Sequence, residues 1–96
     1  MRVRWLRLAL ANLDHIASYI AQDNPVAARQ TVRRIVTAIN TLAANPQLDI
    51  SKAGRVPGTR ELVVDETYIM PYRIRNEVLE VLRVMHARQR WPNRFP

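Results

Sequence analysis

The sequence predicts a small α+β fold in which an N-terminal hairpin of two helices packs on an antiparallel sheet of three C-terminal strands. Residues 7–44 carry two apolar stripes with helical spacing, and residues 58–86 carry three short apolar runs of strand type. A loop rich in Pro, Gly and Ser separates the two halves. A chain of 96 residues with 48% apolar content suffices for one core, so residues 1–96 are treated as a single domain.

The helical hairpin is predicted from the period of the apolar residues. They recur every three or four positions over Arg7–Gln22 and again from Val26 to about Ala44, as in two amphipathic helices. Between the stripes, Asn24 is placed to cap the second helix and Pro25 to occupy its first position, where a missing N–H costs nothing. The connection is short, which favours antiparallel packing.

Three strands are predicted after the loop, over residues 58–64, 68–74 and 78–86. The connections between them are short enough only for hairpin turns, so the strands form a meander. The segment Arg2–Trp5 places Val3 and Trp5 on one face and is a candidate for a short additional strand at the sheet edge.

One proline constrains the pairing of the second strand. Pro71 has no N–H to donate to a ladder and belongs at an edge or a bulge. The strand is kept because Tyr68, Met70, Tyr72 and Ile74 alternate onto one face. We therefore expect Pro71 to face a gap in the pairing.

The chain is basic, with a net charge of +7 from fifteen basic and eight acidic residues, and Lys52 is the one lysine. Arginine presents a planar fork of donors that matches phosphate and carboxylate groups. A high-GC codon bias would also enrich arginine without any function. The net positive charge is stronger evidence than the bias toward arginine. A small basic protein in a cell that contains many polyanions either binds one of them or has its charge covered by a partner.

The composition excludes several kinds of site. Without cysteine there are no disulfides, thiolate ligands or thiol catalysis, as is typical of a reducing cytoplasm. His15 and His86 have no acidic cluster beside them, so we expect no metal and no cofactor. No segment approaches the roughly 18 apolar residues of a membrane span. We expect a cytoplasmic protein without a membrane partner.

The C-terminal end carries the main functional signal. From His86 onward there is no acidic residue, and cations are interleaved with Trp91 and Phe95. Positive charge at one end of a rigid sheet suits nucleic acid or an acidic partner. The residues expected to bind the target are Arg83, His86, Arg88, Arg90 and Arg94. The alternative is a solvated basic end with no particular target. We expect Trp91 to fold back as a lid on the core.

Two polar side chains near this end have structural alternatives. A lone histidine at a strand end, such as His86, is more often hydrogen-bonded or partner-facing than catalytic, and its neutral ring can donate to a backbone carbonyl and fix the tail. Glu61 lies within a strand beside Leu62 and Val63. This setting favours a structural carboxylate paired with an arginine over a catalytic base.

Several short segments are each weak as sequence signals, but their order and spacing together form a specific pattern. They are Trp5 with the stripe to Ile20, Asn24–Ala28, Leu42 with Asn45–Pro46, Gly58–Leu62, Tyr68–Ile74 and Val81–His86. In this arrangement the chain resembles the RelE/ParE toxins of bacterial type II toxin–antitoxin modules over nearly its whole length. The resemblance implies a helical hairpin on a small antiparallel sheet, in agreement with the periodicity.

The resemblance also implies a growth-arresting toxin that is held by a small antitoxin, acidic at least in its toxin-binding part, in a hetero-oligomer. Two targets are known in the family. ParE-like members poison DNA gyrase, which is the leading interpretation, whereas RelE-like members cut ribosome-bound mRNA. In RelE-like nucleases an arginine commonly follows the aromatic residue of the middle strand and a tyrosine lies near the C-terminus. Here Ile69 follows Tyr68, and no tyrosine occurs beyond Tyr72.

The nuclease alternative has its own candidate residues. If the chain cleaves RNA, they are Arg60, His86 and Arg88, which would supply cations and an acid or base. A third interpretation is an inactive family member that is retained as a binding partner.

Overall fold

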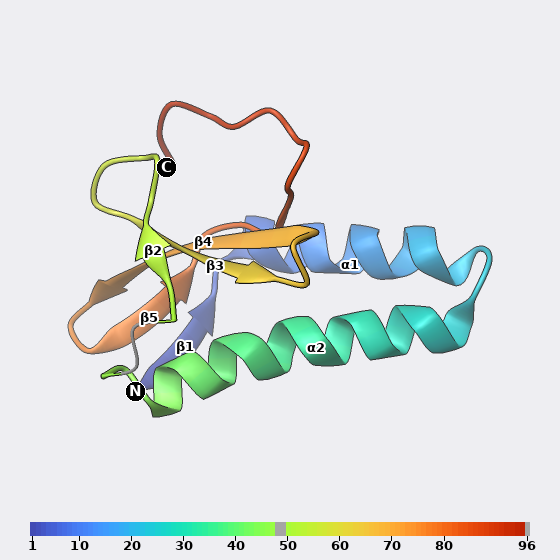
Figure 1. Ribbon diagram of the computed structural model, residues 1–96, viewed down its shortest axis with the longest axis horizontal. Helices are drawn as coiled ribbons and strands as arrows, with labels where there is room; N and C mark the ends of the chain where they lie inside the picture. The colour runs from blue at the N-terminus through green and yellow to red at the C-terminus, as the bar shows by residue number, and fades with distance from the viewer. Residues whose placement is uncertain (48–49, 96) are drawn as a thin grey trace.

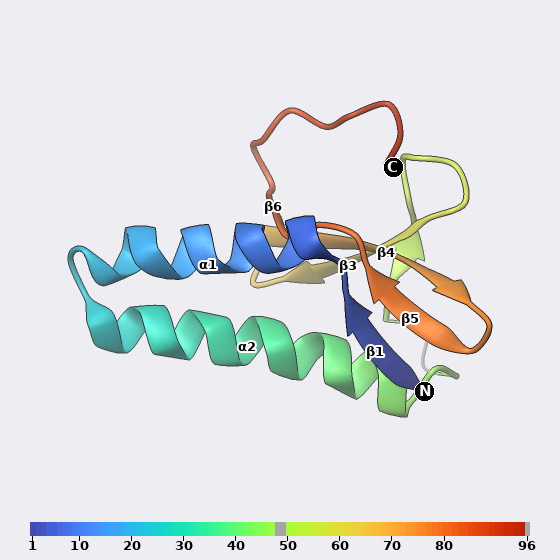
Figure 2. The same ribbon diagram turned by 180° about the vertical axis from the view of Figure 1, so that it is seen from behind.

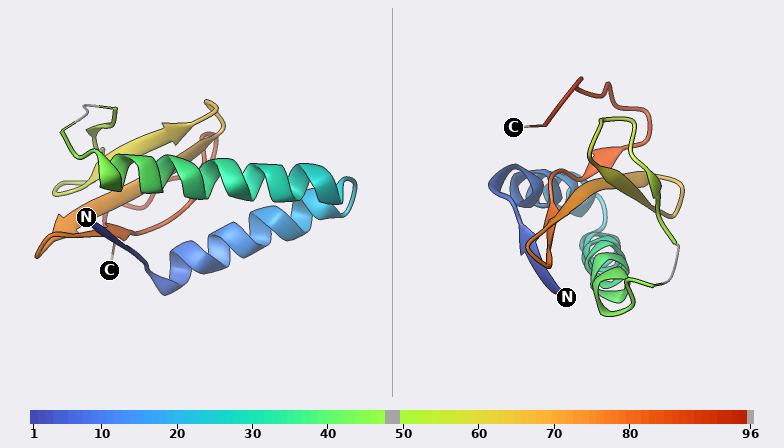
Figure 3. Two further views of the ribbon diagram at one scale, coloured as in Figure 1. Left: turned by 90° about the horizontal axis from the view of Figure 1, so that it is seen from below. Right: turned by 90° about the vertical axis from the view of Figure 1, so that its left-hand side faces the viewer.

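The computed structural model describes residues 1–47 and 50–95. Along the chain the elements are β1 (Arg2–Trp5), α1 (Arg7–Ala21), α2 (Pro25–Ala44), β2 (Lys52–Ala53), β3 (Arg60–Val64), β4 (Tyr68–Arg75), β5 (Val78–Val81) and β6 (Met85–His86). The two helices lie side by side as a hairpin on one side of the sheet, and the C-terminal tail lies on the other (Figures 1 and 3). The predicted α+β architecture is confirmed.

The helix boundaries follow from local chemistry. The side chain of Asn24 accepts a hydrogen bond from the backbone N–H of Ala27 at 3.0 Å, and Pro25 opens α2 as predicted. At the other end Asn45 donates through its side-chain amide to the carbonyl of Thr41 at 3.0 Å, before Pro46 blocks further helix. The Asn24 side chain thus satisfies one free N–H at the start of α2, and the Asn45 side chain adds a second donor to the Thr41 carbonyl, which also accepts from the Asn45 backbone N–H at 3.1 Å.

The sheet is mixed, which corrects the expectation of a purely antiparallel one. Its strand order is β1-β5-β4-β3-β2, and the pairs β2–β3, β3–β4, β4–β5 and β4–β6 are antiparallel. The N-terminal strand β1 does lie at the edge, but it runs parallel to β5. The two helices and strands β2 to β4 lie between β1 and β5 in the chain and provide the long connection that a parallel pair requires (Figure 2).

Two further short strands were not predicted as separate elements. β2 forms within the stretch expected to be a loop, where it pairs with β3. β6 arises because the third predicted strand is interrupted after Val81 and resumes at Met85. The turns of the meander are tight, with positive φ angles at Asp65 and Glu66 and again at Asn76 and Glu77, as in the hairpin turns that match strand twist.

The interruption lies opposite Pro71, as predicted. β5 and β6 pair with β4 on either side of it, through Tyr72↔Val81 and Ile69↔Met85. The N–H of Leu82 still donates to the carbonyl of Pro71 at 2.9 Å, but the reciprocal bond lacks a donor. The N–H of Val84 turns instead to the side chain of Asn12 in α1, at 3.1 Å.

The core fills the space between α2 and the sheet. Its centre is formed by side chains that are almost fully buried, among them Ile35, Ile39, Met70, Leu79 and Val81. Of the alternating residues of β4, all but Ile74 belong to this core or pack against it; Ile74 is 50% exposed near the end of the strand. Within the described residues, no helix combines the length and apolar character needed to cross a membrane.

Candidate target-binding surface

The C-terminal tail begins with a hydrogen-bonded turn at His86. The imidazole Nδ1 accepts from the N–H of Arg88 at 3.1 Å, and the N–H of Gln89 donates to the His86 carbonyl at 2.9 Å. The N–H of His86 in turn donates to Oε1 of Gln89 at 3.2 Å. His86 therefore fixes the start of the tail, which is one of the alternatives drawn from the sequence, but its Nδ1 accepts a hydrogen bond where that alternative has the ring donate one to a carbonyl.

The tail then crosses the face of the sheet that carries no helices (Figures 1 and 3). The guanidinium of Arg55 lies 4.0 Å from the centroid of the Trp91 ring, and the ring of Phe95 packs edge-on against Trp91 at 6.2 Å. The guanidinium of Arg83 lies 5.3 Å from the centroid of the Phe95 ring. Trp91 does fold back, but over this outer face of the sheet and not as a lid on the main core.

The stack of cations and rings is anchored by Glu61. This carboxylate is 1% exposed; it accepts from the backbone N–H of Arg55 at 2.8 Å and from its Nε at 3.2 Å, and Nζ of Lys52 lies 4.0 Å away. A buried charge of this kind persists only when it is paired. Glu61 is thus a paired structural carboxylate, as predicted, and the chain Glu61–Arg55–Trp91 ties the tail to β3.

The residues expected to bind the target fall into two groups. Arg88, Arg90 and Arg94 are exposed and form no ion pair with any residue that the structure describes. Arg83 is half-buried, donates from Nη1 to the carbonyl of Leu82 at 2.8 Å, and has a pKa lowered by burial. His86 packs edge-on against Tyr68 with ring centroids 5.9 Å apart. His86 is exposed as well, so the three arginines and His86 are the members of this group of five that can face a partner.

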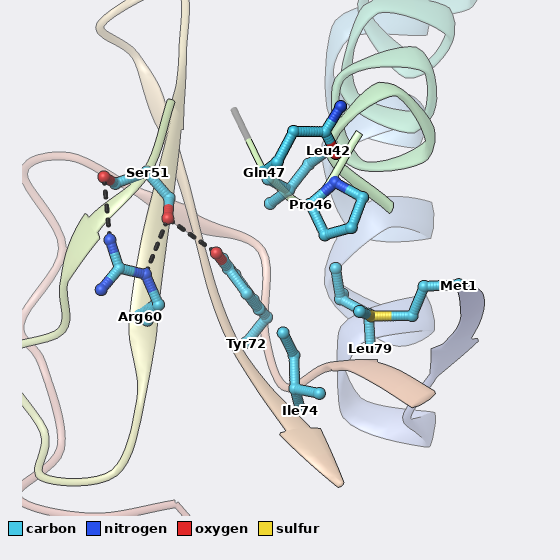
Figure 4. A pocket seen from close by; sticks show the side chains of 9 residues that line it. All are labelled: Met1, Leu42, Pro46, Gln47, Ser51, Arg60, Tyr72, Ile74 and Leu79. Atoms are coloured by element: carbon cyan, nitrogen blue, oxygen red, sulfur yellow. Dashed lines mark hydrogen bonds between the residues drawn. The ribbon is translucent and has the colours of Figure 1, made fainter. Parts of the chain in front are cut away.

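Arg60 lies elsewhere, beside a small pocket of about 310 Å³ at the end of α2 (Figure 4). It donates to the hydroxyl of Ser51 at 2.9 Å and to the Ser51 carbonyl at 3.0 Å, and the same hydroxyl is 2.7 Å from that of Tyr72. In register Arg60 pairs with Tyr72 and His86 with Tyr68. Four residues along β4 correspond to about 13 Å, so the structure does not bring Arg60 next to His86 and Arg88.

Sequence reasoning missed a pocket of about 510 Å³ between α1 and the β4–β6 end of the sheet. It gathers His15 and Tyr19 of α1 with Tyr68, His86 and Gln89. The four-residue spacing of His15 and Tyr19 indicates a shared helix face, but only the tertiary packing brings them to His86. Residues 1–47 and 50–95 contain no group of three or more His, Cys, Asp or Glu side chains that could hold a metal ion.

A second basic region, also missed, lies on the helix-free face of β1, β5 and β4. There Arg73 donates to Glu80 at 2.8 Å, and Arg4 approaches the same carboxylate at 3.7 Å. The hydrogen bond from Arg73 lowers the pKa of Glu80 below its ordinary 4.5, against the effect of burial and with help from the charges of Arg73, Arg75 and Arg4. The carboxylate thus lies in a positive field.

A family model described as the ParE toxin of the type II toxin–antitoxin system, parDE, matches residues 3–91. The chain belongs to the ParE toxin family. A Sinorhizobium fredii protein described as a candidate toxin, Y4kP, is 50% identical over 92 residues, which cover 95% of this chain and 93% of the relative. Toxin RelE2 of Caulobacter vibrioides is 35% identical over 88 residues, covering 90% of this chain and 94% of the relative.

Solved structures agree on the fold of this ParE family member. The chromosomal ParDE TA system from P. aeruginosa superposes with a TM-score of 0.79 at 27% identity, covering 90% of this chain and 95% of that one. The toxin–antitoxin complex RelBE2 from Mycobacterium tuberculosis gives 0.57 at 27% identity, covering 88% and 95%. The resemblance inferred from the sequence is confirmed at the level of family and fold.

The contact between Arg55 and Trp91 leads to a prediction about the tail of this ParE toxin. Trp91→Ala should free the tail, since it removes the ring that Arg55 and Phe95 contact, at a cost of about 1 to 2 kcal/mol in unfolding free energy. Limited trypsin digestion followed by mass spectrometry should show faster cleavage after Arg88 and Arg90. Trp91→Phe, which keeps a ring, serves as the control. Equal cleavage in wild type and Trp91→Ala would show that the contact between Arg55 and Trp91, which we call the clamp, does not hold the tail.

The lowered pKa of Glu80 predicts an acid-dependent loss of stability. Its folded-state pKa lies below 4.5, so the carboxylate stabilises the fold fully above that pH and ceases to do so as the pH falls through the folded-state pKa. Glu80→Gln should therefore lower the melting temperature at neutral pH and flatten its fall in acid. Glu77→Gln, at an exposed carboxylate, is the control, and the measurement is a series of thermal melts from neutral pH to below pH 4.5. Parallel curves for wild type and Glu80→Gln would contradict the assignment.

Proposed function

We propose that this ParE family toxin arrests growth by inhibiting DNA gyrase, and that its C-terminal tail is the surface that engages the enzyme. The observation that carries the proposal is the clamped tail: Trp91 and Phe95 hold it against the sheet, while Arg88, Arg90 and Arg94 stay exposed. Cations on a pinned segment lose little conformational entropy on binding, which favours a defined interface over diffuse attraction.

The separation of the nuclease candidates supports the same choice. RNA cleavage needs a base for the 2′-hydroxyl and cations around one phosphorus, all within a few ångströms. Arg60 is committed to Ser51 at one end of β4, and Nδ1 of His86 is committed to the backbone of Arg88 at the other. The aliphatic Ile69 and the absence of a tyrosine after Tyr72 agree with this reading.

We further propose that a cognate antitoxin covers the helical hairpin. A groove of about 660 Å³ lies between α1 and α2. Its lining includes small apolar residues, namely Ala17, Ala21, Ala28, Val32 and Val36, together with Arg29 and Arg33. Small apolar residues flanked by cations fit an amphipathic helix with acidic residues along its edge. The structural neighbours named above as ParDE and RelBE2 are toxin–antitoxin systems, which supports a partner of this kind.

A ribosome-dependent mRNA endonuclease is the second candidate, because one pocket holds both histidines and two tyrosines. His15 and His86 could exchange a proton with a 2′-hydroxyl and a leaving oxygen, as the chemistry of RNA cleavage requires. No arginine or lysine is among the residues that line this pocket. The charge on phosphorus would have to be stabilised from outside it, which is why gyrase is preferred.

The decisive experiment is a supercoiling assay with purified gyrase and toxin. We expect wild-type toxin to inhibit supercoiling, and Arg88→Ala with Arg90→Ala to raise the half-inhibitory concentration about a hundredfold, since each of the two lost charge-assisted contacts costs about 1.5 kcal/mol. Arg29→Ala with Arg33→Ala removes the same charge from the opposite, helical side and should inhibit like wild type.

The contrary outcome is equally clear. Unaffected supercoiling, together with codon-phased cuts in messenger RNA that disappear in His15→Ala with His86→Ala, would favour the nuclease. Full potency of the Arg88→Ala, Arg90→Ala variant would show that the tail is not the effector surface.

A further inference from the structure

Four arginines form a rectangle on the helix-free face of β1, β5 and β4. In register, Arg2 and Arg75 flank Val78, and Arg4 and Arg73 flank Glu80. Leu79 and Val81 of β5 are buried in the core. Val78 and Glu80 alternate with them along β5, so these two residues and the arginines paired with them point to the outer face of the sheet. Two residues along a strand span about 7 Å and two strand spacings about 10 Å, which sets the dimensions of the rectangle.

This arginine rectangle carries a net positive charge. Its members contribute four positive charges against the single carboxylate of Glu80, whose pKa is lowered first by the hydrogen bond from Arg73 and then by the charges of Arg73, Arg75 and Arg4. Arg2 and Arg75 are exposed and have no ion pair within the part of the chain that the structure describes. A hollow of about 530 Å³ lies between β1 and the β4–β5 turn. The rings of the tail contact Arg55 and Arg83, which lie outside the rectangle.

The lining of the hollow indicates what kind of polyanion fits. Apart from Val3 and Val78 it is polar, so it lacks the aromatic or large aliphatic anchors on which protein interfaces depend. No aromatic ring lines it, so it offers no platform for the unstacked bases of a single strand. Arginine side chains bind the phosphates of a DNA duplex, and this binding requires neither large apolar anchors nor aromatic rings.

We infer that the arginine rectangle binds the sugar–phosphate backbone of duplex DNA without reading its sequence. It is separate from the tail, so the toxin has two cationic surfaces: one for its protein target and one for DNA. The inference goes beyond the proposed gyrase target, and it is measured without gyrase, so either proposal can fail while the other stands.

The test is fluorescence anisotropy of the full chain with a labelled duplex of roughly 20 base pairs, over about 50 to 200 mM salt. Arg2→Ala with Arg75→Ala should weaken binding about tenfold and reduce the slope of log affinity against log salt by nearly 2, since each phosphate contact contributes about 0.9. Arg29→Ala with Arg33→Ala and Arg88→Ala with Arg90→Ala remove equal charge elsewhere and should keep the wild-type slope. Should the double variant fold poorly by circular dichroism, the single Arg75→Ala should lower the slope by about 0.9.

Three results would overturn the inference. They are absence of duplex binding by the wild type, an equal loss in all three double variants, and tighter binding of the single strand than of the duplex. A labelled polyglutamate peptide is included as well. If it binds through Arg2 and Arg75 while the duplex does not, the surface serves an acidic protein instead.

Discussion

The missing N–H of Pro71 is the constraint on which the outer face of this ParE toxin depends. Leu82 donates to the carbonyl of Pro71 but receives nothing in return, and its own carbonyl is left without a strand partner. Nη1 of Arg83 fills that position at 2.8 Å. The guanidinium that replaces the backbone donor also lies against Phe95, so one absent hydrogen bond in the central strand places a cation where the tail can be held.

The start of β4 determines where the tail leaves the sheet. His86 pairs with Tyr68, the first residue of β4, so β6 has no partner on this strand beyond His86 and the chain turns there. The tail then crosses the outer face, where Arg55, which is paired with Glu61, lies against Trp91. Two faces of the sheet thereby acquire different roles: one buries α2, and the other displays charge.

Much of the fold could be predicted from the sequence because its signals are local. Helical period, the Asn24–Pro25 cap and the alternation in β4 each act over a few residues, and even the pairing gap at Pro71 follows from one residue type. The parallel pairing of β1 with β5 could not be predicted, since nothing in Arg2–Trp5 specifies a partner more than seventy residues away. The arginine rectangle was missed for that reason, because half of it lies on β1. His15 and His86 were likewise considered singly, since only the packing of α1 beside β6 joins them.

The link between a clamped tail and gyrase inhibition is tested most directly by the supercoiling assay with Trp91→Ala. This change leaves every arginine in place and removes only the ring that holds the tail against Arg55. We expect inhibition to weaken several-fold although the net charge is unchanged, because a free tail must pay the ordering entropy on binding. Inhibition equal to that of the wild type would contradict the view that the pinned pose of the tail matters.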